Sequence, residues 1–228
     1  MGNLGRPGYL STTDGMWPYS YHDGCDAGIT ANQSSADGIS FLPGMKLPGC
    51  TCARADHPGA GRARSAPEID IIEASVGDIG GGRVVGTASQ SAQYAPFDAW
   101  YQPNYDFVEV YSRDVTSMNS YRGGNFQQAV SGVTVLNNAW YDGEQYQTYG
   151  FEYVPGDAGH IVWNVGRDPT WKLRAQATAS NGNVGQRPVP TEPMSIIMNV
   201  GMSHSFAWID FARLAGVLPA KMRVDWCV

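Results

Sequence analysis

The sequence predicts an all-β protein, folded as an antiparallel β-sandwich of the jelly-roll kind. Glycine and proline are frequent, with 28 and 14 copies among 228 residues, and they divide the chain into short segments. Helical periodicity is scarce, whereas short runs of alternating or β-branched apolar residues recur after residue 66. Short strands separated by turns are typical of sandwiches and barrels. We expect residues 1–228 to form a single domain, because this length fits one large all-β unit.

The first part of the chain, residues 1–66, is predicted to consist mostly of long irregular loops. Two blocks within it, GMWPYSYHDGCDAG and CTCARADHPGAGRARSAP, are dense in turn-forming residues. A loop region of this length in a compact domain usually lines a functional site.

Strands are predicted to follow these loops. The segments TYGFEYV, HIVWNVG and MSIIMNVGM show the clearest strand patterns, and residues 155–159 form a hairpin turn between the first two. Residues 214–220 are expected to form one short helical turn. The predicted strands are 68–75, 83–93, 106–113, 126–135, 146–154, 159–165, 194–201 and 221–228.

The stretch APEIDIIEA, residues 66–74, places Glu68, Asp70 and Glu73 among isoleucines. In strict alternation Glu68 and Asp70 share one face of the strand, whereas Glu73 points to the other. A β-bulge, with one extra residue at positions 71–72, returns Glu73 to the face of the other two acids. Like charges at i and i+2 lie about 7 Å apart and repel, and acids are poor strand formers. An ordinary solvent-facing strand is therefore the less favoured interpretation.

Clustered carboxylates suit glycoside hydrolysis or metal binding. A retaining glycosidase needs one carboxylate as nucleophile and one carboxylic acid as proton donor, and a third acid between them shifts their proton affinities apart. Calcium is the rival, but it usually takes oxygen ligands from loops that wrap around the ion. Because a stiff isoleucine-rich strand wraps poorly, we expect neither a metal nor another cofactor.

Composition narrows the function classes further. The net charge of −6 argues against a nucleic-acid partner. No apolar run is long enough to cross a membrane, and the first residues lack a signal-peptide pattern. Both ends resemble the interior of a domain, so we expect targeting and anchoring segments to lie outside this chain.

Aromatic residues make up 11% of the chain and offer flat surfaces for stacking on sugar rings. Packing in the sandwich core is the competing explanation for each strand tryptophan, whereas a cluster in the long loop is harder to explain as core. The candidate sugar-binding residues are Trp17, Tyr19, Trp100, Trp163 and Trp208.

The cysteines of the loop region suggest a covalent link. A disulfide from Cys25 to Cys50 or Cys52 would fasten the long loop. A zinc site of these cysteines with His57 is the weaker alternative, because a C-x-C pair with no histidine at ligand spacing is a weak zinc signal. Cys227 is expected to be a buried thiol in the last strand. Asn32 begins an Asn-Gln-Ser glycosylation sequon, which favours the secretory pathway.

The spacing Glu-x-Asp-x-x-Glu resembles the catalytic strand of glycoside hydrolase family 16, in its bulged, laminarinase-like branch. The segments QTYGFEYVPGDAGHIVWNVG, MSIIMNVGMS and MRVDWCV resemble later strands of the same family. The resemblance implies a concanavalin-A-like jelly roll that acts on β-glucans and related polysaccharides.

The chain is more closely similar to fungal β-glucan synthesis-associated proteins of the SKN/KRE type. Blocks such as MGNLGRPGYLSTTDGMWPYSYHDGCDAG, GRARSAPEIDIIEA and SQSAQYAPFDAWYQ carry this resemblance over essentially the whole chain. It implies a type II membrane protein with this domain on the lumenal or extracellular face, and N-terminal sandwich strands that precede residue 1. It also implies a role in β-1,6-glucan assembly in the cell wall.

Residue by residue, the resemblance implies that Glu68 is the nucleophile, Glu73 the general acid/base and Asp70 a helper that tunes the pair. Gln90 or Gln93 takes the place of a histidine that many laminarinase-like relatives carry on the next strand. The expected function is a retaining β-glucan glycosidase or transglycosylase. The alternatives are a non-catalytic glucan-binding or scaffolding module on the same fold and, less favoured, a calcium-dependent lectin-like sandwich.

Overall fold

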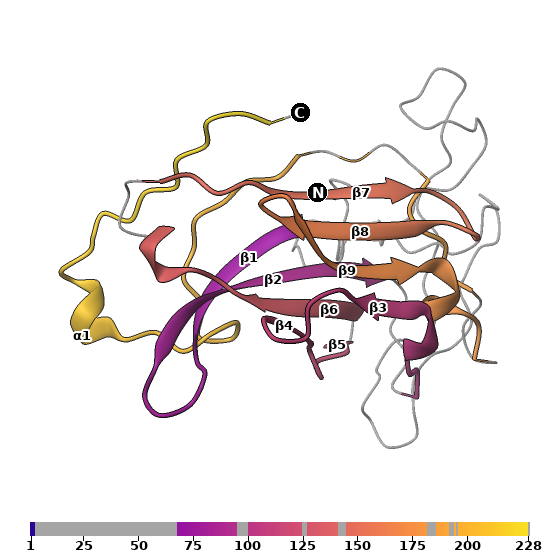
Figure 1. Ribbon diagram of the computed structural model, residues 1–228, viewed down its shortest axis with the longest axis horizontal. Coiled ribbons are helices and arrows are strands. Elements are labelled where there is room, and N and C mark those ends of the chain that lie inside the picture. Colours follow the sequence, from indigo (N-terminus) through magenta and orange to yellow (C-terminus); the bar gives the residue numbers. More distant parts are fainter. Residues whose placement is uncertain are drawn as a thin grey trace, which may run out of the picture.

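The structure is a computed structural model, and it consists mainly of two antiparallel sheets (Figure 1). In the first sheet the strand order is β1 (Glu68–Asp78), β2 (Val84–Tyr94), β6 (Gln127–Val135) and β4 (Thr116–Met118), and β5 (Gly123–Gly124) also pairs with β6. In the second the order is β3 (Val108–Val110), β9 (Asp168–Arg174), β8 (His160–Val165) and β7 (Tyr149–Val154). The residues described are 1–2, 68–94, 100–124, 127–140, 145–181, 186–191, 194 and 196–227.

The two sheets enclose a common hydrophobic core, which confirms the predicted β-sandwich. Trp163 on β8 and Trp171 on β9 are fully buried and stack with ring centroids 4.0 Å apart and planes 10° apart. Ile69 on β1 is equally buried on the facing sheet. The remaining buried members of this cluster are Ala92, Tyr94, Val130, Ile161, Leu173, Ala175, Ala177 and Val189.

In the part of the chain that the structure describes, turns of 3-10 helix accompany the strands: η2 (Tyr105–Phe107), η3 (Asn138–Trp140) and η4 (Ala175–Thr178). The predicted strand over 106–113 is therefore wrong at its start, because η2 precedes the three-residue β3. The predicted strands over 68–75, 83–93, 126–135, 146–154 and 159–165 correspond to β1, β2, β6, β7 and β8 with shifted ends. The hairpin at residues 155–159 joins β7 to β8 as predicted.

Strand β9 was not predicted, and its sequence explains why. Pro169 sits at its second position, and proline weakens any prediction of a strand. Lys172 and Arg174 alternate with the buried Trp171 and Leu173, but this strand pattern covers only the last four residues of β9. Only the neighbouring strands β3 and β8, which pair with it on both sides, define this segment as a strand.

The predicted strands over 194–201 and 221–228 are wrong for the residues that the structure describes there. Residues 196–227 contain no strand, and many of their large apolar side chains, such as Val200 and Trp226, are more than half exposed. In Figure 1 this yellow segment runs along the outside of the sheets. Cys227 is correspondingly an exposed thiol instead of a buried one. A segment with alternating apolar residues forms a strand only where a neighbouring strand supplies the hydrogen bonds.

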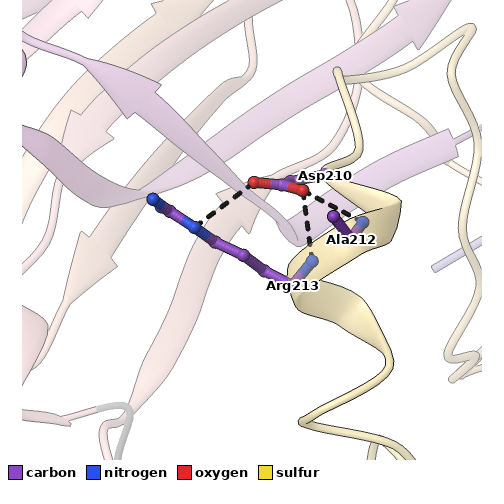
Figure 2. A network of polar contacts seen from close by, with 3 residues as sticks. All are labelled: Asp210, Ala212 and Arg213. Carbon is purple, nitrogen blue, oxygen red and sulfur yellow. Dashed lines mark hydrogen bonds and ion pairs between the residues drawn. The ribbon is translucent and has the colours of Figure 1, made fainter.

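The one α-helix of the described residues, α1 (Phe211–Leu214), begins three residues before the predicted helical turn. Asp210 sets its start, because the side-chain Oδ1 accepts hydrogen bonds from the backbone N–H groups of Ala212 and Arg213 at 3.1 and 3.2 Å. Figure 2 shows this cap together with the ion pair between Arg213 Nε and Asp210 Oδ2, 3.5 Å apart.

Within the core, Tyr94 at the end of β2 lies near the buried guanidinium of Arg187. Burial raises the pKa of the Tyr94 hydroxyl far above its ordinary value, and the charge of Arg187 acts in the opposite direction. The Arg187 guanidinium stacks over the ring of Tyr101, 4.0 Å from its centroid. Tyr94 therefore stays neutral and contributes to packing.

We predict that Gly132→Ala destabilises the protein by about 1–3 kcal/mol, because it overpacks the core. A Cβ at Gly132 would lie 2.7 Å from Trp171 Nε1, and the stack with Trp163 restricts movement of that ring. Gly201→Ala is the matched control, since a Cβ there meets no atom within 4 Å. Thermal unfolding of the three proteins checks this, and an equal midpoint for both variants would contradict it.

Candidate active site

The three acids of β1 lie on one face of the strand, as their spacing predicts. Directly paired positions across antiparallel strands point to the same face, and the pairs are Glu68 with Gln93, Asp70 with Ser91, and Glu73 with Ser89. Between the second and third pairs, β1 has two residues, at positions 71–72, where β2 has only one. The predicted β-bulge is therefore confirmed.

The bulge gives the acids an even spacing. Measured on β2, each acid lies two residues from the next, which corresponds to about 7 Å along the strand. Asp70 stands between the two glutamates. Glu68 is nearly buried, with 4% of its surface exposed, whereas Glu73 is half-buried. Of the three isoleucines of this stretch, only Ile69 is fully buried in the core.

Short polar side chains of β2 hold the central acid. Ser91 Oγ donates a hydrogen bond to Asp70 Oδ2 at 2.7 Å, and Ser91 is 1% exposed. Gln93 Nε2 donates to Ser91 Oγ at 3.1 Å and lies 3.4 Å from Asp70 Oδ2. Hydrogen bonds to a carboxylate are stronger than those between neutral groups, so they fix the orientation of Asp70 between the glutamates.

Gln93 thus lies beside the acids, in the place where the sequence predicts either Gln90 or Gln93. Its proposed contact with a sugar stays a prediction. Ser91 was not predicted. The alternation of side chains along β2 could have indicated it, because Ser91 and Gln93 lie on the same face of the strand. The information that sequence reasoning lacked was the register that brings them opposite Asp70 and Glu68.

Gln90 does not lie beside the acids, and its prediction as a sugar-binding residue is wrong. The side chain is fully buried on the core face of β2. Its Nε2 donates to the backbone oxygens of Ile71 at 3.0 Å and Asn164 at 3.1 Å. Adjacent residues on a strand point to opposite faces, so Gln90 and Gln93 cannot both face the acids.

Trp163 is also a core residue, which corrects its prediction as a sugar-stacking platform. Its ring is fully buried against Trp171, and its Nε1 donates a hydrogen bond to the backbone oxygen of Asp70 at 3.0 Å. The indole therefore supports the acidic strand β1 from its core face.

Two of the other aromatic candidates are accessible, as a stacking platform requires. Trp100 and Trp208 are 66% and 71% exposed, and their contact with a sugar stays a prediction. The remaining predicted site residues lie outside the described residues; they are Trp17, Tyr19, Cys25, Cys50, Cys52 and Asn32.

Within the part of the chain that the structure describes, no group of three or more His, Cys, Asp or Glu side chains is placed to hold a metal ion. The helices of this same part are all too short or too polar to cross a bilayer.

We predict that Ser91→Ala lowers the free energy of unfolding by about 1.5–3 kcal/mol, because it removes a buried hydrogen bond to a charged group. Ser89→Ala, two residues away on the same face, serves as control and changes it by less than about 0.5 kcal/mol. Denaturant unfolding measures both, and equal losses would show that the hydrogen bond to Asp70 has no special weight.

Comparison with known proteins places the chain in a family. The family model described as "Beta-glucan synthesis-associated protein SKN1/KRE6/Sbg1" matches residues 1–228. The chain is 54% identical over 231 residues to "Beta-glucan synthesis-associated protein SKN1" of Candida albicans, covering 99% of this chain and 30% of that protein. For "Beta-glucan synthesis-associated protein KRE6" of Saccharomyces cerevisiae (strain ATCC 204508 / S288c), the identity is 53% over 231 residues, covering 99% and 31%.

The chain spans about a third of the length of these relatives. No solved structure shows significant similarity to it. Since the family model matches every residue from 1 to 228, the chain belongs to the family of β-glucan synthesis-associated proteins SKN1/KRE6/Sbg1.

Proposed function

We propose that the chain carries the active site of a retaining β-glucan glycosidase or transglycosylase. The observation that carries this proposal is the bulge in β1, which aligns Glu68, Asp70 and Glu73 at even spacing on one face. A structural strand has no need of three mutually repelling carboxylates in a row. A double-displacement reaction needs two of them, and a third between them couples their protonation.

In the proposed reaction, Glu68 attacks the anomeric carbon and forms a glycosyl–enzyme ester while the bond to the leaving sugar breaks. Glu73 gives its proton to the leaving oxygen. It then takes a proton from the incoming acceptor, whose oxygen displaces Glu68. Water as acceptor gives hydrolysis, and a sugar hydroxyl gives transfer. Asp70, which Ser91 holds by a hydrogen bond, is the helper that shifts the proton affinities of the two glutamates apart.

The relatives carry the name β-glucan synthesis-associated protein, and this favours β-glucan as the substrate of our chain. We extend the proposal to synthesis and remodelling of cell-wall β-glucan, with β-1,6-glucan as the product affected. Association with synthesis favours transfer over hydrolysis, because transfer conserves the number of glycosidic bonds.

One observation favours a second candidate, a non-catalytic glucan-binding or scaffolding module. Glu68 has only 4% of its surface exposed, and a nucleophile must reach the anomeric carbon of its substrate. On this alternative, the half-buried Asp70 and Glu73 accept hydrogen bonds from sugar hydroxyls, and no covalent bond forms.

The test uses the full-length protein with β-1,3- and β-1,6-gluco-oligosaccharides, and products are sized by mass spectrometry. We expect Glu68→Gln to abolish turnover while binding persists, because the amide keeps the shape but cannot act as nucleophile. Glu73→Ala should lower turnover by about 10²–10⁴-fold, the usual contribution of general acid–base catalysis.

Glu109→Gln is the matched control, because Glu109 is an exposed glutamate on β3 of the other sheet. It should retain the activity of the unmodified protein. Longer products would indicate transfer and shorter ones hydrolysis. Turnover that survives Glu68→Gln would exclude the proposed nucleophile, and binding without turnover in the unmodified protein would favour the scaffolding module.

We also propose that the domain works on the lumenal or extracellular face of a membrane of the secretory pathway, attached through a segment outside this chain. The sequon at Asn32 supports this, because only chains that enter this pathway receive N-linked glycans. Endoglycosidase treatment of the protein from its host should increase its gel mobility, and Asn32→Gln should remove that shift. A protein without any endoglycosidase-sensitive glycan would count against the proposal.

A further inference from the structure

Two β-bulges face each other across the sandwich. The first is the bulge of β1 at positions 71–72. The second lies in β9, where Thr170 is an extra residue between the pairs Trp163–Trp171 and Asn164–Pro169. A bulge disrupts the ladder and leaves backbone groups without their usual partners, so each bulge needs polar groups from elsewhere.

The side chain of Gln90 joins the two bulges. Its two N–H groups donate to Ile71 O of β1 and to Asn164 O of β8, at 3.0 and 3.1 Å. Its Oε1 accepts a hydrogen bond from Thr170 Oγ1 of β9 at 2.8 Å. Every donor of the amide is thus used, in a place with no exposure to solvent.

We propose that Gln90 is a positioning residue, which holds the β1 bulge in place and thereby sets the offset of Glu73 from Glu68 and Asp70. The inference rests on the proposed function, because the offset matters for a reaction in which two carboxylates act on one bond. Gln90 touches none of the acids. It acts through the carbonyl of Ile71, which lies two residues before Glu73.

The physical basis is the cost of buried polar groups without partners. Without the Gln90 amide, Ile71 O and Asn164 O each lose a donor, and Thr170 Oγ1 keeps only the more distant of its two acceptors, Trp163 O. Trp163 supports only the neighbouring carbonyl, that of Asp70. The strand relieves the cost by losing its bulge, and a one-residue slip of register turns Glu73 to the opposite face.

The test replaces Gln90 by methionine, which has a similar shape but cannot donate or accept these hydrogen bonds. The matched control is Gln128→Met. Gln128 is also buried, lies on the core face of the same sheet and donates from its amide to a backbone oxygen, that of Arg122, at 3.0 Å. Strand β2 lies between β6 and β1, and the donor to the bulge at Ile71 O comes from Gln90, so Gln128→Met removes a buried amide of the same chemistry and leaves that donor in place.

The kinetic readout is the split between kcat and KM of the full-length protein on β-gluco-oligosaccharides. We expect Gln90→Met to lower kcat by about 10²–10⁴-fold, as for loss of the general acid/base, because the slipped register turns Glu73 away from the other acids. KM should change little, because binding by the rest of the sugar chain does not depend on Glu73. Gln128→Met should keep the unmodified kcat.

The structural readout does not depend on activity. Glu73 and Ser89 are direct partners, and the Cα atoms of such pairs lie about 4.5–5.5 Å apart, within disulfide range. Glu73→Cys with Ser89→Cys should therefore cross-link on mild oxidation, and Ile72→Cys with Ser89→Cys should not. Adding Gln90→Met should reverse this preference, and adding Gln128→Met should leave it.

The two readouts separate the possible failures. If the unmodified protein shows no Glu68-dependent turnover, the proposed function fails, and cross-linking alone decides the role of Gln90. If cross-linking is unchanged by Gln90→Met, the inference is overturned, whatever happens to kcat. If Gln90→Met does not fold, Thr170→Val replaces it, because it keeps the bulk and the Gln90 amide and removes the hydroxyl that donates to Gln90 Oε1 and to Trp163 O. It should then shift both readouts in the same direction by smaller factors.

Discussion

The side chain of Gln90 joins the acidic strand to the opposite sheet, because its amide donates both to the carbonyl of Ile71 on β1 and to that of Asn164 on β8. The bulge at the Ile71 carbonyl decides which way Glu73 points, and hence whether three acids or two share a face. A bulge is an interruption of the ladder, so it persists only if buried partners satisfy its backbone groups. Here the partners come from residues whose side chains fill the core between the sheets.

This arrangement divides the work between the two faces of β1. On one face, Asp70 and the two glutamates repel one another, and donors such as Ser91 offset part of that cost. On the other face, Ile69 and the indole of Trp163 anchor the strand by burial and by a hydrogen bond to the Asp70 carbonyl. The repulsion on the acidic face of β1 can persist because close packing keeps the opposite, apolar face rigid.

The core side chains behind the acids illustrate how one chemistry serves two purposes. Amide and indole N–H groups are common sugar-binding groups, and they are equally suited to backbone carbonyls that a bulge leaves unpaired. Gln90 and Trp163 have the second role. The residues that do face the acids are Ser91 and Gln93, and their residue types alone do not mark them as site residues. Contact with Asp70 gives them their significance.

The sequence by itself determined the acidic strand, its bulge and the β7–β8 hairpin, because period-two alternation and turn residues act within a few positions of one another. Register, partner strands and the inner face were decided only by tertiary structure, since they depend on contacts between residues far apart in the chain. Gln90 is 74 positions from Asn164, whose carbonyl it meets. For the same reason the sequence did not predict β9, although two strands pair with it in the structure. Alternation of apolar residues also predicted strands at the end of the chain, where the described residues 196–227 contain none. A local pattern fixes which side chains share a face, and the packed fold decides what that face meets.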